Sequence, residues 1–239
     1  MKTDTLYLPA KTRHFEDFGF MQAYLSFKPH LPRERQHFGS LITIDDGVLQ
    51  PGAQGFGLHP HKNVEVVTFM VSGEVKHIDP NDVSHNGTLK SKGIQVITAG
   101  SGIIHNEENN SSNEPMRALQ IWFTPRASNL PPNFSRKHLK PEQYENKLVC
   151  ILSPDGVEES LIVQQDVYLN YGNFSESTTL TYQPRNNAKR TFIYIIEGAM
   201  KTLGNRLEKG DGFGINNGDE LSVEISDNAE FLLFEINSL

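Results

Sequence analysis

The sequence predicts an all-β protein made of two jelly-roll β-barrels in tandem. Short runs rich in β-branched and aromatic residues recur along the 239 residues, at spacings typical of sandwiches and barrels. The 19 glycines and 13 prolines fall between these runs, as expected of turns. The second half repeats the rhythm of the first, which indicates a duplicated barrel. The amphipathic helices that a doubly wound α/β sheet needs are not evident.

In the first half, a polar start precedes expected strands at 39–44, 64–71, 75–78, 94–98 and 118–123. Asp45-Asp46-Gly47 has the composition of a turn, and Ser72-Gly73-Glu74 that of a hairpin turn. In the second half, we expect strands at 191–196 and 230–236, the first of which ends in Glu197-Gly198. The proline-rich stretch 124–145 predicts a connection between domains, with a short helical turn near 141–145. We therefore place the first domain at 1–134, and the connection with the second domain at 135–239.

Composition restricts the possible partners. The formal net charge of −7 disfavours direct binding to nucleic acid or to an anionic membrane, but is compatible with a protein partner. No run approaches the ~20 apolar residues of a membrane helix, and no signal peptide is visible. The single cysteine, Cys150, has no internal disulfide partner, so we expect a reducing, cytoplasmic compartment. Two fused barrels bury their faces without a partner, and we expect a monomer.

Two short motifs indicate a metal site. In His59-Pro60-His61, the two imidazoles are two residues apart and project from the same side of an extended chain. In His105-Asn106-Glu107, which follows the turn Gly100-Ser101-Gly102, a histidine and a carboxylate are spaced in the same way. On neighbouring strands the two pairs would present three nitrogens and one carboxylate to a common point. This ligand set suits Fe(II), Mn, Co, Ni, Cu or Zn.

Other histidines receive the ordinary interpretation of hydrogen-bonded core or surface residues. They are His14, His30, His37, His77, His85 and His138. All nine histidines lie at or before residue 138, so a histidine metal site is confined to the first domain.

Glu65 competes with Glu107 for the fourth ligand position, since a regular strand from His61 would aim it inward as well. It would lie roughly 13 Å along from His61, whereas Glu107 is only about 6–7 Å along from His105. We therefore prefer Glu107 as ligand and expect Glu65 to hydrogen-bond nearby or in the interior. Phe56, Phe69 and Phe123 could line an apolar pocket for a flat ring, although each could equally be barrel core.

At these residues the sequence resembles the pirin family of bicupins, especially bacterial members with quercetin 2,3-dioxygenase activity. The matching stretches are GFGLHPHKNVEVVTFMVSG (55–73), QVITAGSGIIHNE (95–107) and LQIWFTP (119–125). The resemblance runs from about Phe18 to the C-terminus and implies two cupin domains. It also implies the metal ligands His59, His61, His105 and Glu107, which agrees with the spacing of the motifs.

The resemblance further implies a reaction. A flavonol such as quercetin would react with dioxygen at one divalent transition metal, with Fe(II) the expected ion, and ring opening would release carbon monoxide. Glu107 would be both a ligand and the base that takes the flavonol proton. The metal would acidify the bound hydroxyl and hold the reactants together.

Two other functions stay open at this point. One is a metal-containing regulatory protein that senses redox state or binds a protein partner, as pirins have been described to do. The other is a degenerate cupin with an adventitious metal and an unrelated role. Fold alone does not choose among them, because cupins host many chemistries.

Overall fold

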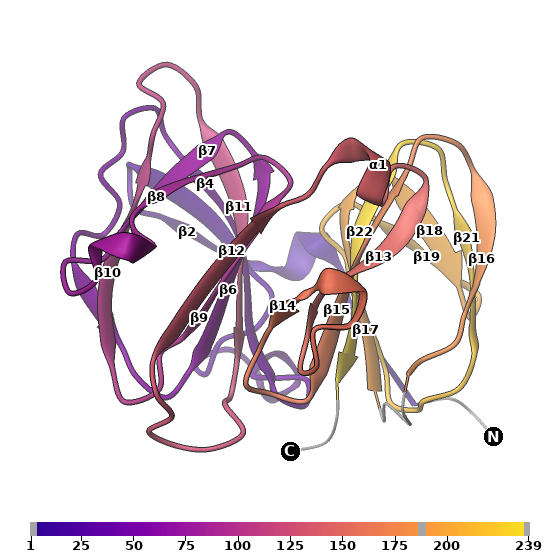
Figure 1. Cartoon of the computed structure of the whole chain (residues 1–239). Coiled ribbons are helices and arrows are strands. Elements are labelled where there is room, and N and C mark those ends of the chain that lie inside the picture. Colours follow the sequence, from indigo (N-terminus) through magenta and orange to yellow (C-terminus); the bar gives the residue numbers. More distant parts are fainter. Residues whose placement is uncertain (1–3, 186–189, 237–239) are drawn as a thin grey trace.

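The computed structural model describes residues 4–185 and 190–236, which form two β-barrels side by side (Figure 1). Each barrel consists of a seven-stranded sheet and a four-stranded sheet. The prediction of an all-β, two-barrel protein is therefore confirmed. The helical segments are short: η1 (Ala10–Thr12), η2 (Arg33–Arg35), η3 (Val83–His85), α1 (Pro141–Tyr144) and η4 (Val157–Glu159).

The N-terminal barrel has a seven-stranded sheet in the order β12-β9-β6-β11-β4-β3-β2 and a four-stranded sheet in the order β5-β10-β7-β8. The strands of the larger sheet are β2 (His14–Asp17), β3 (Met21–Leu25), β4 (Leu41–Leu49), β6 (Glu65–Ser72), β9 (Gly93–Thr98), β11 (Met116–Phe123) and β12 (Asn133–His138). Those of the smaller sheet are β5 (His59–His61), β7 (Glu74–Ile78), β8 (Gly87–Lys90) and β10 (Ile103–Asn109).

The C-terminal barrel repeats this arrangement with sheet orders β1-β20-β17-β22-β15-β13-β14 and β16-β21-β18-β19. The strands of the larger sheet are β1 (Thr5–Leu8), β13 (Lys147–Ser153), β14 (Leu161–Ile162), β15 (Val167–Phe174), β17 (Arg190–Glu197), β20 (Gly212–Ile215) and β22 (Ala229–Ile236). Those of the smaller sheet are β16 (Thr178–Tyr182), β18 (Ala199–Thr202), β19 (Asn205–Glu208) and β21 (Leu221–Ile225).

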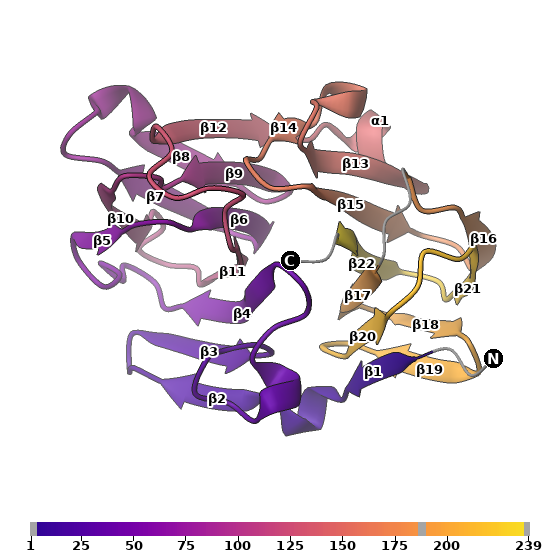
Figure 2. The ribbon, with the colours of Figure 1, turned by 90° about the horizontal axis from the view of Figure 1, so that it is seen from below.

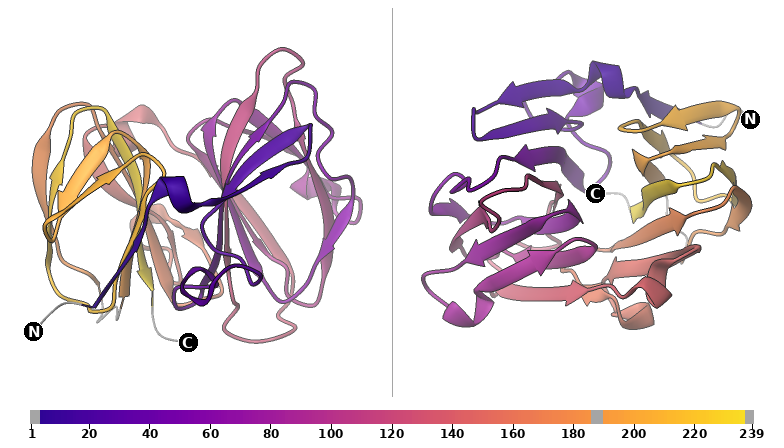
Figure 3. Two further views of the ribbon diagram at one scale, coloured as in Figure 1. Left: turned by 180° about the vertical axis from the view of Figure 1, so that it is seen from behind. Right: turned by 90° about the horizontal axis from the view of Figure 1, so that it is seen from above.

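Strand pairing does not follow the expected division at residue 134. Strand β1 pairs antiparallel with β20, so the first strand of the chain completes the C-terminal barrel (Figure 2). The chain then crosses through η1 to β2 in the N-terminal barrel (Figure 3). At the other end, β12 extends past residue 134 and pairs along its whole length with β9.

The two large sheets pack against each other around one core, which we call the interdomain core. Phe27 and Phe38 of the first half pack on Phe192 of the second, with ring centroids 5.3 and 5.5 Å apart, and Phe69 lies 4.9 Å from the Tyr171 ring. Burial of such large side chains contributes about 1.5–3 kcal/mol each. The N-terminal barrel therefore rests on the C-terminal one through one face of its large sheet.

A buried ionic network lies beside this core. Asp46 accepts hydrogen bonds from Arg117 at 2.8 and 2.9 Å, from Arg13 at 3.2 Å and from the Tyr194 hydroxyl at 2.9 Å. Arg117 also donates to Glu197 at 2.7 Å. Burial opposes the ionisation of Asp46, but the hydrogen bonds and charge of Arg117 keep its pKa below the usual range. The network links strands of both barrels.

The strands differ from the sequence analysis in three places. Asp45-Asp46-Gly47 is not a turn, because β4 runs unbroken through it and pairs on both sides, with β3 and β11. The polar start contains strands β1, β2 and β3. The connection 124–145 includes strand β12, although the expected helical turn is present as α1.

Candidate metal centre

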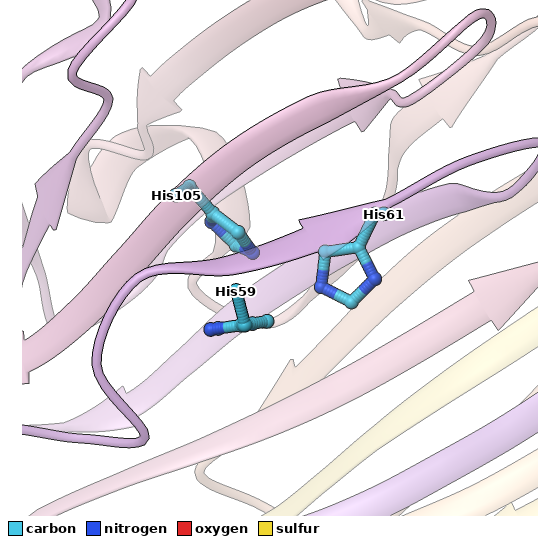
Figure 4. Close-up of side chains that lie close together, drawn as sticks. All are labelled: His59, His61 and His105. Atoms are coloured by element: carbon cyan, nitrogen blue, oxygen red, sulfur yellow. The ribbon is translucent and has the colours of Figure 1, made fainter.

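Strands β5 and β10 bring three histidines together. They pair antiparallel with His105 opposite His59 and Ile103 opposite His61. The imidazole centroids are 4.9 Å apart for His59 and His61, 4.6 Å for His59 and His105, and 4.9 Å for His61 and His105. Figure 4 shows the three rings converging from the two strands. One ligand atom from each lies within 4.8 Å of the others, as a shared metal ion requires.

Glycine makes the close approach to this site possible. Gly55 lies in the loop before β5 with a φ of +67°, where a Cβ would sit 2.0 Å from the carbonyl oxygen of Glu107. Any other residue would push this loop away from β10 and would also be strained at that φ. The Gly-rich segment before β5 therefore allows its backbone to contact β10, the strand that carries His105.

Hydrogen bonds hold two of the histidines in the tautomer that binds metal through Nε2. His59 Nδ1 donates to the Gly57 carbonyl at 2.8 Å, which leaves its Nε2 lone pair free. His77 Nδ1 donates to the His85 carbonyl at 3.1 Å. Neutral His77 can then only accept at Nε2, so His105 Nδ1 donates to it, over 3.1 Å. His105 Nε2 is left deprotonated.

The electrostatics keep His61 and His105 neutral. Burial, helped by neighbouring imidazoles, lowers the pKa of His105 to about 2. Burial and the charges of His59 and Lys28 lower the pKa of His61 to about 4. His105 Nε2 is buried and has no hydrogen-bond partner within the described part of the chain. An unpaired buried acceptor is costly, and a metal ion would satisfy it, so the residues fit a divalent metal.

Glu107 lies in the same cavity but is held by side-chain donors. Its Oε1 accepts hydrogen bonds from Thr68 at 3.1 Å and Gln95 at 2.5 Å, and its Oε2 accepts one from Gln120. Full burial raises its pKa to about 7, although these three hydrogen bonds oppose the shift. A carboxylate offers about four lone-pair sites, so Oε2 keeps capacity for a metal. Glu107 as ligand and base stays a prediction.

Glu65 does not point into this cavity. It is fully buried, and its Oε2 accepts hydrogen bonds from the Thr98 hydroxyl at 2.8 Å and the Gln164 backbone N–H at 3.4 Å. The expectation that it shares the side of His61 assumed one regular strand, but β5 ends at His61 and Asn63 adopts a φ of +52°. Its role is interior hydrogen bonding near the second barrel, where burial raises its pKa.

The three histidines and Glu107 line a cavity of about 300 Å³ inside the N-terminal barrel. All residues of its wall fall between Glu16 and Trp122, so the second barrel does not contribute to it. Phe56 lies on the wall as expected. Phe69 and Phe123 belong to the interdomain core instead, since their strands turn the alternate residues toward the cavity.

Sequence reasoning missed the side chains around the candidate ligands. His77 received the ordinary interpretation, yet it is buried and contacts His105. Gln95 and Gln120 each interrupt an apolar strand. A buried amide in such a strand needs an internal hydrogen-bond partner, so this pattern in the sequence could have identified both residues.

A second group of possible ligands lies outside the cavity floor. His14, Glu16 and His30 have ligand atoms within 4.8 Å of one another. His14 and His30 are exposed to solvent, and water satisfies such groups, so no metal is needed to account for them.

The fold and the site define a protein of two cupin barrels with a histidine-rich metal centre in the first. Residues 5–123 match the pirin family, and residues 150–236 match the quercetinase C-terminal cupin domain. The chain belongs to the pirin family, as the resemblance implied. No described helix is long and apolar enough to cross a membrane.

Individual relatives agree with this assignment. A quercetin 2,3-dioxygenase of Escherichia coli K12 is 28% identical over 229 residues, which cover 95% of this chain and 96% of the relative. A putative quercetin 2,3-dioxygenase of Zymomonas mobilis is 26% identical, with 94% and 95% covered. The crystal structure of the bacterial pirin YhhW of Escherichia coli in complex with nickel(II) is similar, with a TM-score of 0.90 and 26% identity over 99% of this chain and 100% of that one.

Proposed function

We propose that this protein is a metal-dependent dioxygenase that opens the heterocyclic ring of a flavonol and releases carbon monoxide. One observation carries the proposal: an apolar cavity that ends on three clustered histidines and one buried carboxylate. A cavity of about 300 Å³ is at the lower end of the range for small-molecule sites. Relatives named quercetin 2,3-dioxygenase support the flavonol as substrate class.

His59, His61, His105 and Glu107 would hold the metal, for which we propose Fe(II) in this chain. Nickel(II) is the ion in the similar YhhW structure, and such ligand sets discriminate weakly among first-row ions. When bound, the metal acidifies a coordinated hydroxyl and holds the substrate near dioxygen.

The chain's own residues position and deprotonate the substrate. Hydrogen bonds to Gly57 and His77 fix the imidazoles of His59 and His105, so the ligand atoms are preorganised. Glu107 takes the hydroxyl proton, because a carboxylate beside the bound hydroxyl can accept it directly. Thr68 keeps its carboxylate in place by a hydrogen bond. The apolar wall excludes water from the reacting groups.

The test is turnover by protein loaded separately with Fe(II), Mn, Co, Ni or Cu. Loss of quercetin absorbance, oxygen uptake and carbon monoxide release should coincide for at least one metal. His105→Ala should lose the metal, and Glu107→Gln should lose turnover. Glu65→Gln is the matched control, since it changes a buried carboxylate on the other side of the sheet and should retain both metal and turnover.

Absence of turnover with every metal, in protein that binds metal normally, would refute the enzyme and favour the regulatory function. Full turnover by Glu107→Gln would refute the base assignment alone.

A further inference from the structure

A half-buried ion pair on the wall of the cavity has no part in holding the metal. Lys28 follows β3, and Asp45 lies in the middle of β4; Lys28 Nζ is 2.7 Å from Asp45 Oδ2. Both side chains line the cavity, with exposed fractions of only 20% and 13%. Lys28 Nζ also lies 4.9 Å from the centre of the Trp122 ring, which in turn contacts the His61 ring at 5.1 Å. The pair is therefore beside the metal ligands but separate from them.

This pair retains hydrogen-bonding capacity that the described residues do not use. Asp45 Oδ1 is buried and has no partner among them. An ammonium has three donors, and Asp45 Oδ2 engages one of the three on Lys28. A buried, unpaired carboxylate oxygen destabilises the fold. Burial raises the pKa of Asp45 to about 6 even though Lys28 opposes the shift.

The unused capacity selects one kind of ligand group. A ligand carboxylate would be repelled by Asp45 and by Glu16, which also lines the cavity. A ligand cation could pair with Asp45 or Glu16, but it would leave the remaining donors of Lys28 unused. A hydroxyl can donate to one partner and accept from the other, so it satisfies both members of the pair. Apolar neighbours on the same wall, such as Met21 and Leu25, accommodate the ring that bears the hydroxyl.

We propose that Lys28 and Asp45 form a subsite for a ring hydroxyl of the substrate, which donates to the Asp45 carboxylate and accepts from Lys28 Nζ. The proposal rests on the proposed function only in taking the ligand to be a flavonol. It restricts the substrate class to flavonols with a hydroxyl on a ring away from the metal-binding oxygen. Such a site discriminates strongly, because a ligand without the hydroxyl leaves both charged partners unpaired.

The test compares two probes, quercetin and 3-hydroxyflavone, which lacks the ring hydroxyls. Dissociation constants are measured without oxygen on metal-loaded protein, so that turnover is not required. Quenching of Trp122 fluorescence reports binding, since this is the only tryptophan of the chain and lies on the cavity wall. The wild type should prefer quercetin by about 10- to 100-fold, as expected of a hydrogen bond to a charged partner.

Lys28→Met and Asp45→Asn should each reduce this preference to less than threefold, by weakening quercetin and leaving 3-hydroxyflavone unchanged. Glu16→Gln is the matched control, because it alters another carboxylate of the wall and should keep the preference. Metal content of each variant should equal that of the wild type. If Asp45→Asn fails to fold, Lys28→Met decides the result alone.

The proposal is overturned if the wild type does not prefer quercetin, or if the variants weaken both probes equally. These outcomes are independent of catalysis. Selective loss of quercetin binding in a protein without turnover would support the subsite and refute the dioxygenase. Turnover with unchanged selectivity in the variants would do the reverse.

Discussion

Glu107 should make the stability of the metal-free protein fall as the pH rises. The side chain is fully buried, and this burial raises the pKa of Glu107 from 4.5 to about 7. No cation is among the groups that lower this pKa again. Its stabilising contribution is complete below the unfolded value of 4.5 and is lost as the pH rises through about 7. A shift of this size corresponds to about 3 kcal/mol in the free energy of unfolding.

Glu107→Gln removes this titration while it keeps the size of the side chain. The assay is urea unfolding of both metal-free proteins at pH 4.5 and at pH 8. The imidazoles of His61 and His105, whose pKa values are lowered, act in the opposite direction, but they are common to both proteins. The difference between the two proteins therefore isolates Glu107. It should move by about 3 kcal/mol in favour of the variant between the two pH values.

A difference that does not change with pH would refute the reasoning, because it would mean that Glu107 is ionised at its ordinary pKa despite its burial. Metal loading provides a further check. A cation favours the ionised carboxylate, so the advantage of the variant at pH 8 should disappear in the loaded protein.

Two further predictions concern the surroundings of the site, and a third concerns the cysteine of the C-terminal barrel. His77→Leu should weaken metal affinity by about 10- to 100-fold, measured by competition with a chromophoric chelator. His85→Ala should not, because His77 hydrogen-bonds the backbone carbonyl of His85 and not its side chain. Gly55→Ala should lower both metal affinity and the melting temperature. The control is Gly52→Ala, which has a φ of +68° but open space around a Cβ and should therefore show only the backbone strain. Equal effects of the two substitutions would contradict the steric argument. Burial raises the pKa of Cys150 to about 11, so alkylation at pH 8 should proceed only on unfolding, and rapid labelling of the native protein would be inconsistent with it.

The sequence was informative about the site where chemistry and strand periodicity coincide. His59 and His61, two residues apart, project from one strand as expected, and His105 meets them from the neighbouring strand. The prediction for Glu65 failed because it assumed that the alternation of a regular strand continues past the end of β5. Glu65 faces the second barrel because the chain turns at Asn63, and a positive φ at an asparagine leaves no certain trace in sequence.

The strand errors have a different cause. Asp45-Asp46-Gly47 has turn composition, but tertiary partners override local preference: Asp45 pairs with Lys28 and Asp46 with Arg117. Charged residues on both faces of a central strand are tolerated only when each finds a partner. Those partners are distant in sequence, so composition alone could not reveal them. The same holds for β1, whose partner β20 is about 200 residues away.

The large sheet of the first barrel connects the second barrel to the metal centre. Its central strands β4, β6 and β11 send alternate residues to opposite sides. On β11, Gln120 and Trp122 line the cavity, while Leu119 and Ile121 enter the interdomain core. A single layer of strands thus separates the metal centre from the C-terminal barrel. Close-packed interiors transmit displacement, so a large-to-small change in the interdomain core reaches the site through this layer.

Phe192→Ala provides the test of this coupling. The side chain lies in the second barrel, fully buried, and packs on Phe27 and Phe38. We expect the free energy of unfolding to fall by about 3–5 kcal/mol and metal affinity to fall with it. Phe174→Ala is the control, because this residue packs in the separate core of the C-terminal barrel and should destabilise the protein without weakening the metal site. If both variants bind metal as the wild type does, the second barrel supports the fold of the first barrel but not the geometry of its ligands.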